Sequence, residues 1–329
     1  MKVLTLDHDQ ITDLLTMSDC IEVMADCLRA VADGDIHNPL RTIIRPPGAS
    51  GLLGLMPAYL GGDDAVFGVK AICVFPGNPS IGKDAHQGAV ILFSGETGEL
   101  MAVMNASAIT AIRTAAVSAV ATRALARPES SRVAIIGAGV QARAHLEAMA
   151  AVLPVERFRI AGRDPERLRL MVEAAAATVS GSVEAAASVE AAVRDADVVV
   201  TVTSSARPVI DRAWIAPGTH IVAVGSSIPT AQEIDSATMA AARLFVDRRE
   251  STINESGDYL MALADGAIPG PDHIVAELGE VLARRSQGRR SDDEITLFES
   301  LGLAAEDLAA ARHLLDIAET ASAGVWVEL

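Results

Sequence analysis

Cysteine and positive charge are both scarce in this sequence of 329 residues. The three cysteines are widely spaced and form no Cys-x-x-Cys pair, which excludes a disulfide-stapled miniprotein and predicts a reducing, cytoplasmic environment. Basic residues number 27 and acidic residues 43, so the net charge at pH 7 is -16. Because an acidic protein repels polyanions, we expect no nucleic-acid partner.

Long apolar runs and clustered metal ligands are also missing. The longest uncharged run, residues 213–232, is interrupted by two prolines and several polar residues, so we expect no membrane span. The N-terminal segment reaches Asp7, His8 and Asp9 before any apolar stretch of signal-peptide length. The seven histidines show no His-x-x-x-His or mixed Cys/His spacing, and we therefore expect no metal site.

The length and the 50% content of hydrophobic residues suit two globular domains rather than one. From about residue 131 to 250, short β-branched runs alternate with helical stretches, which is typical of an α/β domain with a parallel sheet. The first 120 residues instead show alternating segments between Pro/Gly-rich turns, which predicts an α+β domain. The predicted strands of the parallel sheet are 133–136, 158–160, 198–202, 221–224 and 244–246.

A glycine loop follows the first of these strands. Gly137, Gly139 and Ala142 fit the pattern Gly-x-Gly-x-x-Ala between a strand and a helix. The first glycine permits a tight turn, the second lets the backbone approach a pyrophosphate, and the small third residue allows close packing of the helix. A purely structural turn is the alternative, but the flanking strand and helix favour a dinucleotide site.

The end of the second strand bears on the choice of cofactor. Ile160-Ala-Gly162 ends without the acidic residue that usually binds the ribose hydroxyls of NAD, and Arg163 follows. An arginine suits a 2′-phosphate, so the sequence favours NADP over NAD. The alternative is that Arg163 is a solvated surface charge and that Asp164, more simply a helix cap, reaches the ribose.

Two solitary cations stand in apolar surroundings. Arg113 is the only charged residue from Leu100 to Thr122, a stretch expected to form a buried helix, and Lys70 lies on a predicted strand that is otherwise uncharged. A buried unpaired charge is expensive, so the partner must be an internal carboxylate or an anion that arrives with a ligand. A structural ion pair is the simpler alternative for both residues.

Two further residues are weaker candidates for the same site. Arg41 lies on an alternating segment, where surface exposure is its simplest interpretation. His86 lies in a polar, turn-like stretch, where a histidine is more often solvated, although its pKa range suits proton transfer.

Taken in order along nearly the whole chain, these stretches resemble the ornithine cyclodeaminase and mu-crystallin family. The matching segments are Arg41–Thr42, Gly54–Tyr59, Gly68–Lys70, His86–Gly88, Glu96–Gly98, Ile109–Ala116, the glycine loop, Glu255–Asp258 and Ile295–Gly302. The resemblance implies a Rossmann-type dinucleotide domain, residues 121–304, inserted into a substrate-binding and dimerisation domain, residues 1–120 plus 305–329. It also implies a homodimer.

The resemblance further implies a role for individual residues. Arg41, Lys70 and Arg113 would grip the carboxylate of an α-amino or α-imino acid beside the nicotinamide, with Ser227 near the substrate and Lys70 as the catalytic residue. The positions that would line the cofactor are Arg113, Gly137, Gly139, Val140, Gln141, Arg163, Thr203, Val224, Gly225 and Ser226.

Departures from the family pattern narrow the expected reaction. Cyclodeaminases have an acid/base aspartate at the position of Ser227, and serine cannot replace it at neutral pH. The stretch Ser227-Ile-Pro229 is more similar to the imine-reductase branch. Ala85 and Asn105 stand where the family often has a hydroxyl residue and an aspartate, which leaves the substrate open.

The predicted function is therefore NAD(P)H-dependent reduction of a small imino acid, a ketimine or cyclic imine carboxylate, or in reverse amino-acid dehydrogenation. The alternatives are an ornithine cyclodeaminase-type lyase that uses bound NAD, and a non-catalytic NADPH-binding protein.

Overall fold

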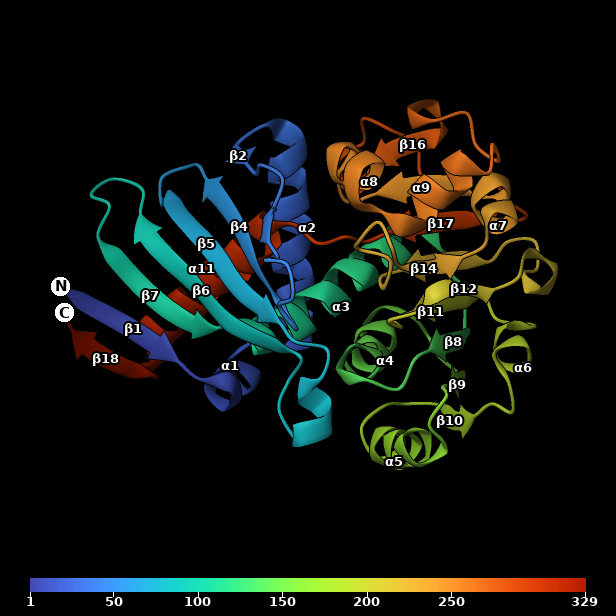
Figure 1. Cartoon of the computed structure of the whole chain (residues 1–329), viewed down its shortest axis with the longest axis horizontal. Coiled ribbons are helices and arrows are strands. Elements are labelled where there is room, and N and C mark those ends of the chain that lie inside the picture. The colour runs from blue at the N-terminus through green and yellow to red at the C-terminus, as the bar shows by residue number, and fades with distance from the viewer. The chain divides into compact units, whose positions relative to one another are not determined.

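The computed structural model describes residues 1–78 and 80–329 and divides into two compact units (Figure 1). The first unit comprises Met1–Arg113 and Leu303–Leu329, and the second comprises Thr114–Gly302. The sequence prediction divided the chain after residues 120 and 304 instead. The first division lies inside helix α3 (Ala106–Leu125), because this helix continues from one unit into the other.

The first unit is an α+β domain built on one sheet. Its strands follow the order β18-β1-β7-β6-β5-β4-β2, with β3 paired to β4; β1 and β7 are parallel and the other pairs are antiparallel. The strands are β1 (Lys2–Leu6), β2 (Ile36–His37), β3 (Thr42–Ile44), β4 (Leu52–Leu60), β5 (Val66–Val74), β6 (His86–Ser94), β7 (Leu100–Asn105) and β18 (Val325–Glu328). The helices are α1 (His8–Leu14), α2 (Met17–Asp33), α11 (Ala304–Ala321) and the short 3-10 helix η1 (Asn78–Ile81).

Helix α11 packs closely on one face of this sheet, with α2 beside it (Figure 1). Residues Val66, Gly68, Lys70 and Ile72 of β5 alternate onto that face and are buried, as the period of two in a strand requires. A Cβ atom on Gly68 would lie 2.9 Å from Leu308 of α11. The missing side chain therefore lets α11 approach β5 next to Lys70.

The second unit is a parallel sheet with helices. Its strands follow the order β10-β9-β8-β11-β13-β17-β15-β16, and every pair is parallel. The strands are β8 (Arg132–Ile136), β9 (Arg157–Ala161), β10 (Ser182–Ala185), β11 (Val198–Thr201), β13 (His220–Ala223), β15 (Arg243–Val246), β16 (Ile274–Glu277) and β17 (Thr296–Glu299), with a separate pair β12 (Ala206–Ile210) and β14 (Gln232–Ile234). The helices besides α3 are α4 (Val140–Val152), α5 (Pro165–Ala176), α6 (Val189–Val193), α7 (Ser236–Ala241), α8 (Arg249–Glu255), α9 (Gly257–Ala264), α10 (Leu278–Leu282), η2 (Arg212–Trp214) and η3 (Pro271–His273).

The five predicted strands are found as β8, β9, β11, β13 and β15. The prediction of a Rossmann-type domain inserted into an α+β domain is confirmed. The order of strands reverses at β8, where β9 and β10 lie on one side and β11 and β13 on the other. Open α/β sheets bind ligands at this switch point, outside the carboxyl ends of the strands. The loops after β8, β9, β11 and β13 all lie at that edge.

Helix α3 is the one helix among the described residues that is long and apolar enough to cross a membrane by length and composition. Its mean hydropathy is 1.2, and 72% of its most apolar window is buried inside the protein. Core helices of globular proteins pass the same test.

Candidate functional site

The glycine loop has the geometry of a phosphate-binding turn. Gly137 adopts a φ of 134°, and a Cβ atom there would lie 2.7 Å from the carbonyl oxygen of Val202. Gly139 is the N-cap of α4 and makes no side-chain capping bond, and a Cβ atom on it would meet nothing within 4 Å. The amino end of α4 is therefore open at Gly139, and a helix N-terminus is where an anionic pyrophosphate is bound.

The other predicted cofactor residues lie at the same edge of the sheet. Val140 is 65% exposed at the start of α4, and Thr203 follows β11. Gly225 follows β13, next to Val224, Ser226 and Ser227. The structure thus gathers residues from the loops after β8, β11 and β13.

Arg163 and Asp164 follow β9 and are both exposed. Asp164 caps α5, because its Oδ1 accepts hydrogen bonds from the backbone N–H groups of Glu166 and Arg167, both at 3.1 Å. One of its two carboxylate oxygens is thus already used within the protein, which agrees with the interpretation of Asp164 as a helix cap.

Lys70 and Arg113 meet in the first unit, where two carboxylates of α11 neutralise them. Lys70 Nζ lies 2.7 Å from Asp307 Oδ2. Arg113 Nε donates to Asp307 Oδ1 at 2.9 Å, and its Nη1 donates to Glu306 Oε2 at 2.6 Å. The two cations are 3% and 4% exposed and both carboxylates are fully buried, so this is a buried ion-pair network.

The sequence left two kinds of partner open for these cations, an internal carboxylate or an anion of a ligand. The structure provides internal carboxylates. The sequence analysis did not identify Glu306 and Asp307 as these partners. Two acidic residues in the first turn of a helix are common, because they interact favourably with the helix dipole. The burial of Lys70 and Arg113 therefore does not by itself identify a substrate anion.

Arg41 also acts electrostatically on this network. The positive charge of Arg41, which is half-buried, lowers the pKa of Lys70.

Burial lowers the pKa of Lys70 from 10.5 to about 8, although Asp307 acts in the opposite direction. An ammonium group with this pKa can release its proton near neutral pH, as a proton donor in a reaction must.

His86 begins β6 and is exposed. Surrounding protein atoms, and after them the charge of Lys70, lower its pKa below the ordinary value. Its imidazole is therefore neutral at physiological pH and its ring nitrogen can accept a proton.

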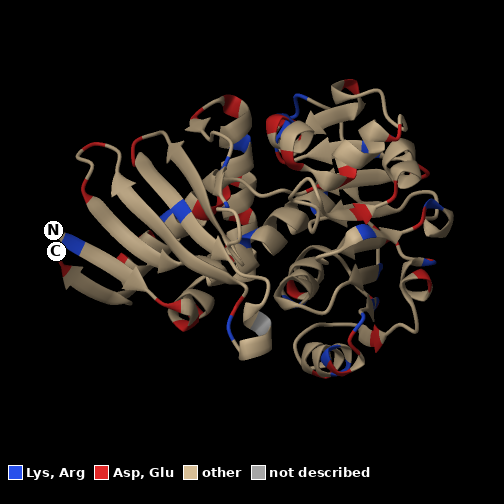
Figure 2. Ribbon diagram, in the orientation of Figure 1, with Lys and Arg blue, Asp and Glu red and all other residues tan. Residues whose placement is uncertain are grey.

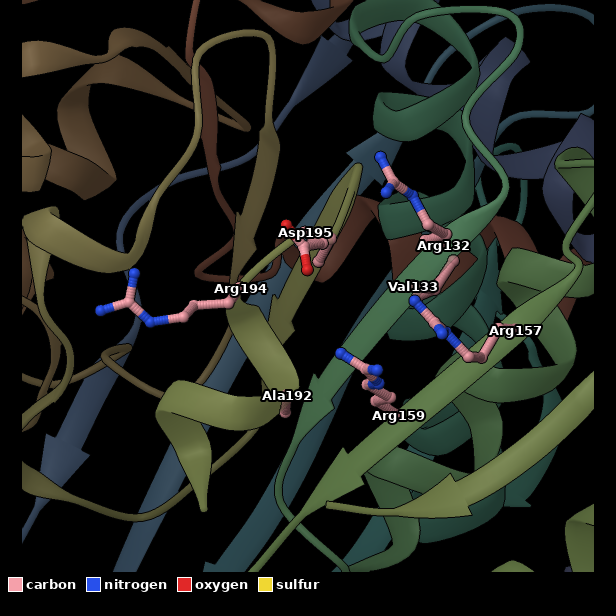
Figure 3. A pocket seen from close by; sticks show the side chains of 8 residues that line it. Arg132, Val133, Arg157, Arg159, Ala192, Arg194 and Asp195 are labelled. Carbon is pink, nitrogen blue, oxygen red and sulfur yellow. The ribbon is translucent and has the colours of Figure 1, made fainter. Parts of the chain in front are cut away.

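A shallow hollow at the other edge of the parallel sheet is not part of this site (Figure 3). Arg132, Arg157 and Arg159 line it, at and near the amino ends of β8 and β9. Arg132 is already paired with Asp197 at 2.8 Å. Among the described residues, no group of three or more His, Cys, Asp or Glu side chains is arranged to hold a metal ion.

Comparison with known proteins gives long matches. The family model described as "Ornithine cyclodeaminase/mu-crystallin family" matches residues 1–322. The ketimine reductase mu-crystallin of Mus musculus is 40% identical over 284 residues, which are 86% of each chain. Among solved structures, a Delta(1)-pyrroline-2-carboxylate reductase from Thermococcus litoralis in complex with NADH and L-proline has a TM-score of 0.95 at 34% identity, covering 98% of this chain and 99% of the other. An archaeal alanine dehydrogenase dimer with bound NAD has a TM-score of 0.93 at 32% identity, covering both chains completely.

Proposed function

The chain belongs to the ornithine cyclodeaminase/mu-crystallin family, and we propose that it is an NAD(P)H-dependent reductase of a small imino acid, or in reverse an amino-acid dehydrogenase. The observation that carries this proposal is the match, over 98% of the chain, to a reductase whose structure holds NADH and L-proline. The glycine loop and the buried network around Lys70 support the same reaction.

The nicotinamide cofactor, when bound, supplies the hydride that adds to the imine carbon. The residues that fit it are Gly137 and Gly139, where the chain is open at Gly139, and the amino end of α4 would hold the pyrophosphate. Gln141, Thr203 and the segment Val224–Ser226 would line the remainder of the cofactor.

Arg41, Lys70 and Arg113 would bind the substrate carboxylate, with Arg113 also close to the cofactor and Ser227 contacting the substrate. A protonated imine needs no further proton from the protein, and binding in the correct orientation provides most of the catalysis. For an unprotonated imine, the Lys70 ammonium donates the proton to nitrogen as hydride reaches carbon.

We propose NADP as the preferred cofactor. Arg163 is exposed after β9, where it can reach a 2′-phosphate, and one carboxylate oxygen of Asp164 is held in the cap of α5. The two solved relatives described above contain NADH and NAD, so either cofactor suits the fold.

A homodimer is proposed on the basis of the first unit's sheet. The face opposite α11 consists largely of half-buried or exposed apolar side chains, including Phe67, Val69, Ile91 and Phe93. Figure 2 shows that the strands of this sheet are mostly uncharged. An apolar face of this kind marks an interface, and the archaeal alanine dehydrogenase is described as a dimer.

A cytoplasmic location is part of the proposal. The support is that Cys20, Cys27 and Cys73 are free thiols.

The proposed reaction is tested by following absorbance at 340 nm with a five-membered cyclic imine carboxylate, a six-membered one and an open-chain imino acid, each with NADH and NADPH. We expect oxidation of the cofactor with at least one substrate, and a large loss of rate in Lys70→Ala. Lys2→Ala, which removes an exposed lysine from the same sheet, is the matched control. An undiminished rate in Lys70→Ala would overturn the role of Lys70.

Two additions to this assay, ornithine as a substrate and a measurement of NADPH binding, separate the alternatives. A cyclodeaminase would convert ornithine to proline and ammonia with catalytic amounts of NAD. A non-catalytic binding protein would bind NADPH without oxidising it in the presence of any of the imino acids.

A further inference from the structure

Three carboxyl groups lie buried in the second unit, at the carboxyl edge of the parallel sheet. Glu233 of β14, Asp258 of α9 and Glu299 at the end of β17 each have no exposed surface. Among the described residues, their hydrogen-bond donors are backbone N–H groups and hydroxyls. Their arrangement is not explained by the glycine loop or by the network around Lys70.

Glu233 joins two of the loops at this edge. Its Oε1 accepts a hydrogen bond from the backbone N–H of Thr203 at 2.5 Å, and its Oε2 accepts one from the N–H of Gly225 at 2.6 Å. Thr203 follows β11 and Gly225 follows β13. A Cβ atom on Gly225 would lie 2.1 Å from the carbonyl oxygen of Thr203 and 2.6 Å from Glu233 Cδ, so the loops and the carboxylate fit together without spare room.

Asp258 and Glu299 use their oxygens differently. Asp258 Oδ1 accepts from the N–H groups of Glu233 and Ile234, at 2.7 and 2.9 Å. Glu299 Oε1 accepts from the hydroxyls of Ser226 and Ser256, at 2.5 and 2.7 Å. Within the described part of the chain, the second oxygen of each group makes no hydrogen bond.

The hydrogen bonds that these oxygens accept indicate which of the three carboxyl groups is ionised. Glu233 uses both oxygens as acceptors, which favours its carboxylate form, whereas Asp258 and Glu299 can each carry a proton on the oxygen that accepts nothing. Two buried carboxyl groups close together do not ionise together easily. Burial raises the pKa of all three groups, that of Asp258 to about 7 and that of Glu299 well above its ordinary value, and the hydrogen bonds from Thr203 and Gly225 act against this rise at Glu233.

We propose that Glu233 is a positioning residue for the dinucleotide: its ionised carboxylate fixes the backbone of Thr203 and Gly225 in the conformation that receives the cofactor. Asp258 holds Glu233 in place through the backbone N–H groups of Glu233 and Ile234. The inference rests on the proposed function, because it requires that the carboxyl edge of this sheet binds NAD(P)H. It assigns a role to a residue that touches the loops and not the cofactor.

The test is the affinity of the full-length protein for NADPH, measured by titrating cofactor fluorescence in Glu233→Gln. Glutamine has the same shape, but its amide NH2 must face one of the two backbone N–H groups. We expect binding at least tenfold weaker, with KM for NADPH raised more than KM for the imino acid. A merely structural role would lower kcat and leave both KM values unchanged.

The same exchange at Glu190 is the matched control. Glu190 is a carboxylate of α6 whose side chain is 45% exposed, and it pairs with Arg194 at the end of the same helix, so Glu190→Gln should leave the NADPH affinity within about twofold of the wild type. Equal weakening in both variants would overturn the positioning role of Glu233.

Failure of the inference differs from failure of the proposed function. If the wild type binds neither NADPH nor NADH, the proposed function fails. If the wild type binds and folded Glu233→Gln binds within twofold of it, the positioning role is wrong. If thermal melting shows that Glu233→Gln does not fold, Glu233→Asp is the second variant, because it keeps the charge but cannot span both N–H groups. We expect Glu233→Asp to weaken NADPH binding at least fivefold. Unchanged binding would contradict the inference.

Discussion

Replacing Asp307 by asparagine disturbs the buried network at its centre. Asp307 binds both Lys70 Nζ, at 2.7 Å, and Arg113 Nε, at 2.9 Å, and none of these groups is more than 4% exposed. Asparagine keeps the shape of the side chain but removes one negative charge. Two buried cations then share Glu306, which already binds Arg113.

Two effects follow from the lost charge. Removing one partner of a buried ion pair destabilises a protein by about 3–5 kcal/mol. Asp307 is also the main influence that raises the pKa of Lys70, so its removal moves that pKa below about 8. Because burial disfavours protonated Lys70, the free energy of unfolding should fall more at pH 6, where Lys70 is charged, than at pH 9, where it is neutral.

The assays are thermal melting at pH 6 and pH 9 and the pH profile of kcat/KM for imine reduction. If protonated Lys70 donates the proton, activity falls as pH rises through its pKa, and Asp307→Asn moves this fall to lower pH. Asp316→Asn is the matched control, because Asp316 lies on the same helix in an exposed pair with Arg312, at 2.9 Å, worth at most about 1 kcal/mol. An unchanged pH profile, or a shift to higher pH, would refute the assigned role of Lys70.

Three further predictions concern the cofactor, the dimer and stability. Arg163→Ala should raise KM for NADPH at least tenfold and leave KM for NADH unchanged, since a charge-assisted bond to phosphate contributes about 1.5–3 kcal/mol; equal changes in the two KM values would contradict the NADP preference. Phe67→Glu, at a side chain that is 51% exposed, should reduce the mass measured by light scattering from that of a dimer to 34.2 kDa, and an unchanged mass would argue against this interface. The pKa of Asp258 is raised by burial, so its contribution to stability is present at low pH and is lost as pH rises towards 7. In urea unfolding, the free energy of unfolding of Asp258→Asn should therefore fall less between pH 4 and pH 7 than that of the wild type. A larger fall in the variant would contradict this prediction.

Local patterns in the sequence predicted much of the fold. Five strands were predicted because their segments are short, apolar and bounded by turn residues, as is typical of strands in a parallel sheet. They are β8, β9, β11, β13 and β15. Strand β17 was not predicted, because Thr296–Glu299 contains two polar residues and is buried only by its position between β13 and β15. Its burial depends on tertiary packing.

Contacts between distant residues could not be predicted in the same way. Arg113 and Asp307 are 194 residues apart, and Glu233 lies 25 and 66 positions before Asp258 and Glu299. The sequence correctly marked Lys70 and Arg113 as buried charges that need partners. It could not show that a helix from the end of the chain supplies both carboxylates, because a pair of acidic residues in a first helical turn is common.

The central claim is that hydride passes from the nicotinamide to the α-carbon of an imino acid. The direct measurement uses NADPH carrying deuterium at C4, on each face in turn, with the imino acid substrates, followed by mass spectrometry of the amino acid product. We predict one deuterium at the α-carbon for each NADPH oxidised, from one of the two faces. A product without deuterium from either face, or ammonia and proline formed from ornithine with no net oxidation of the cofactor, would contradict the account.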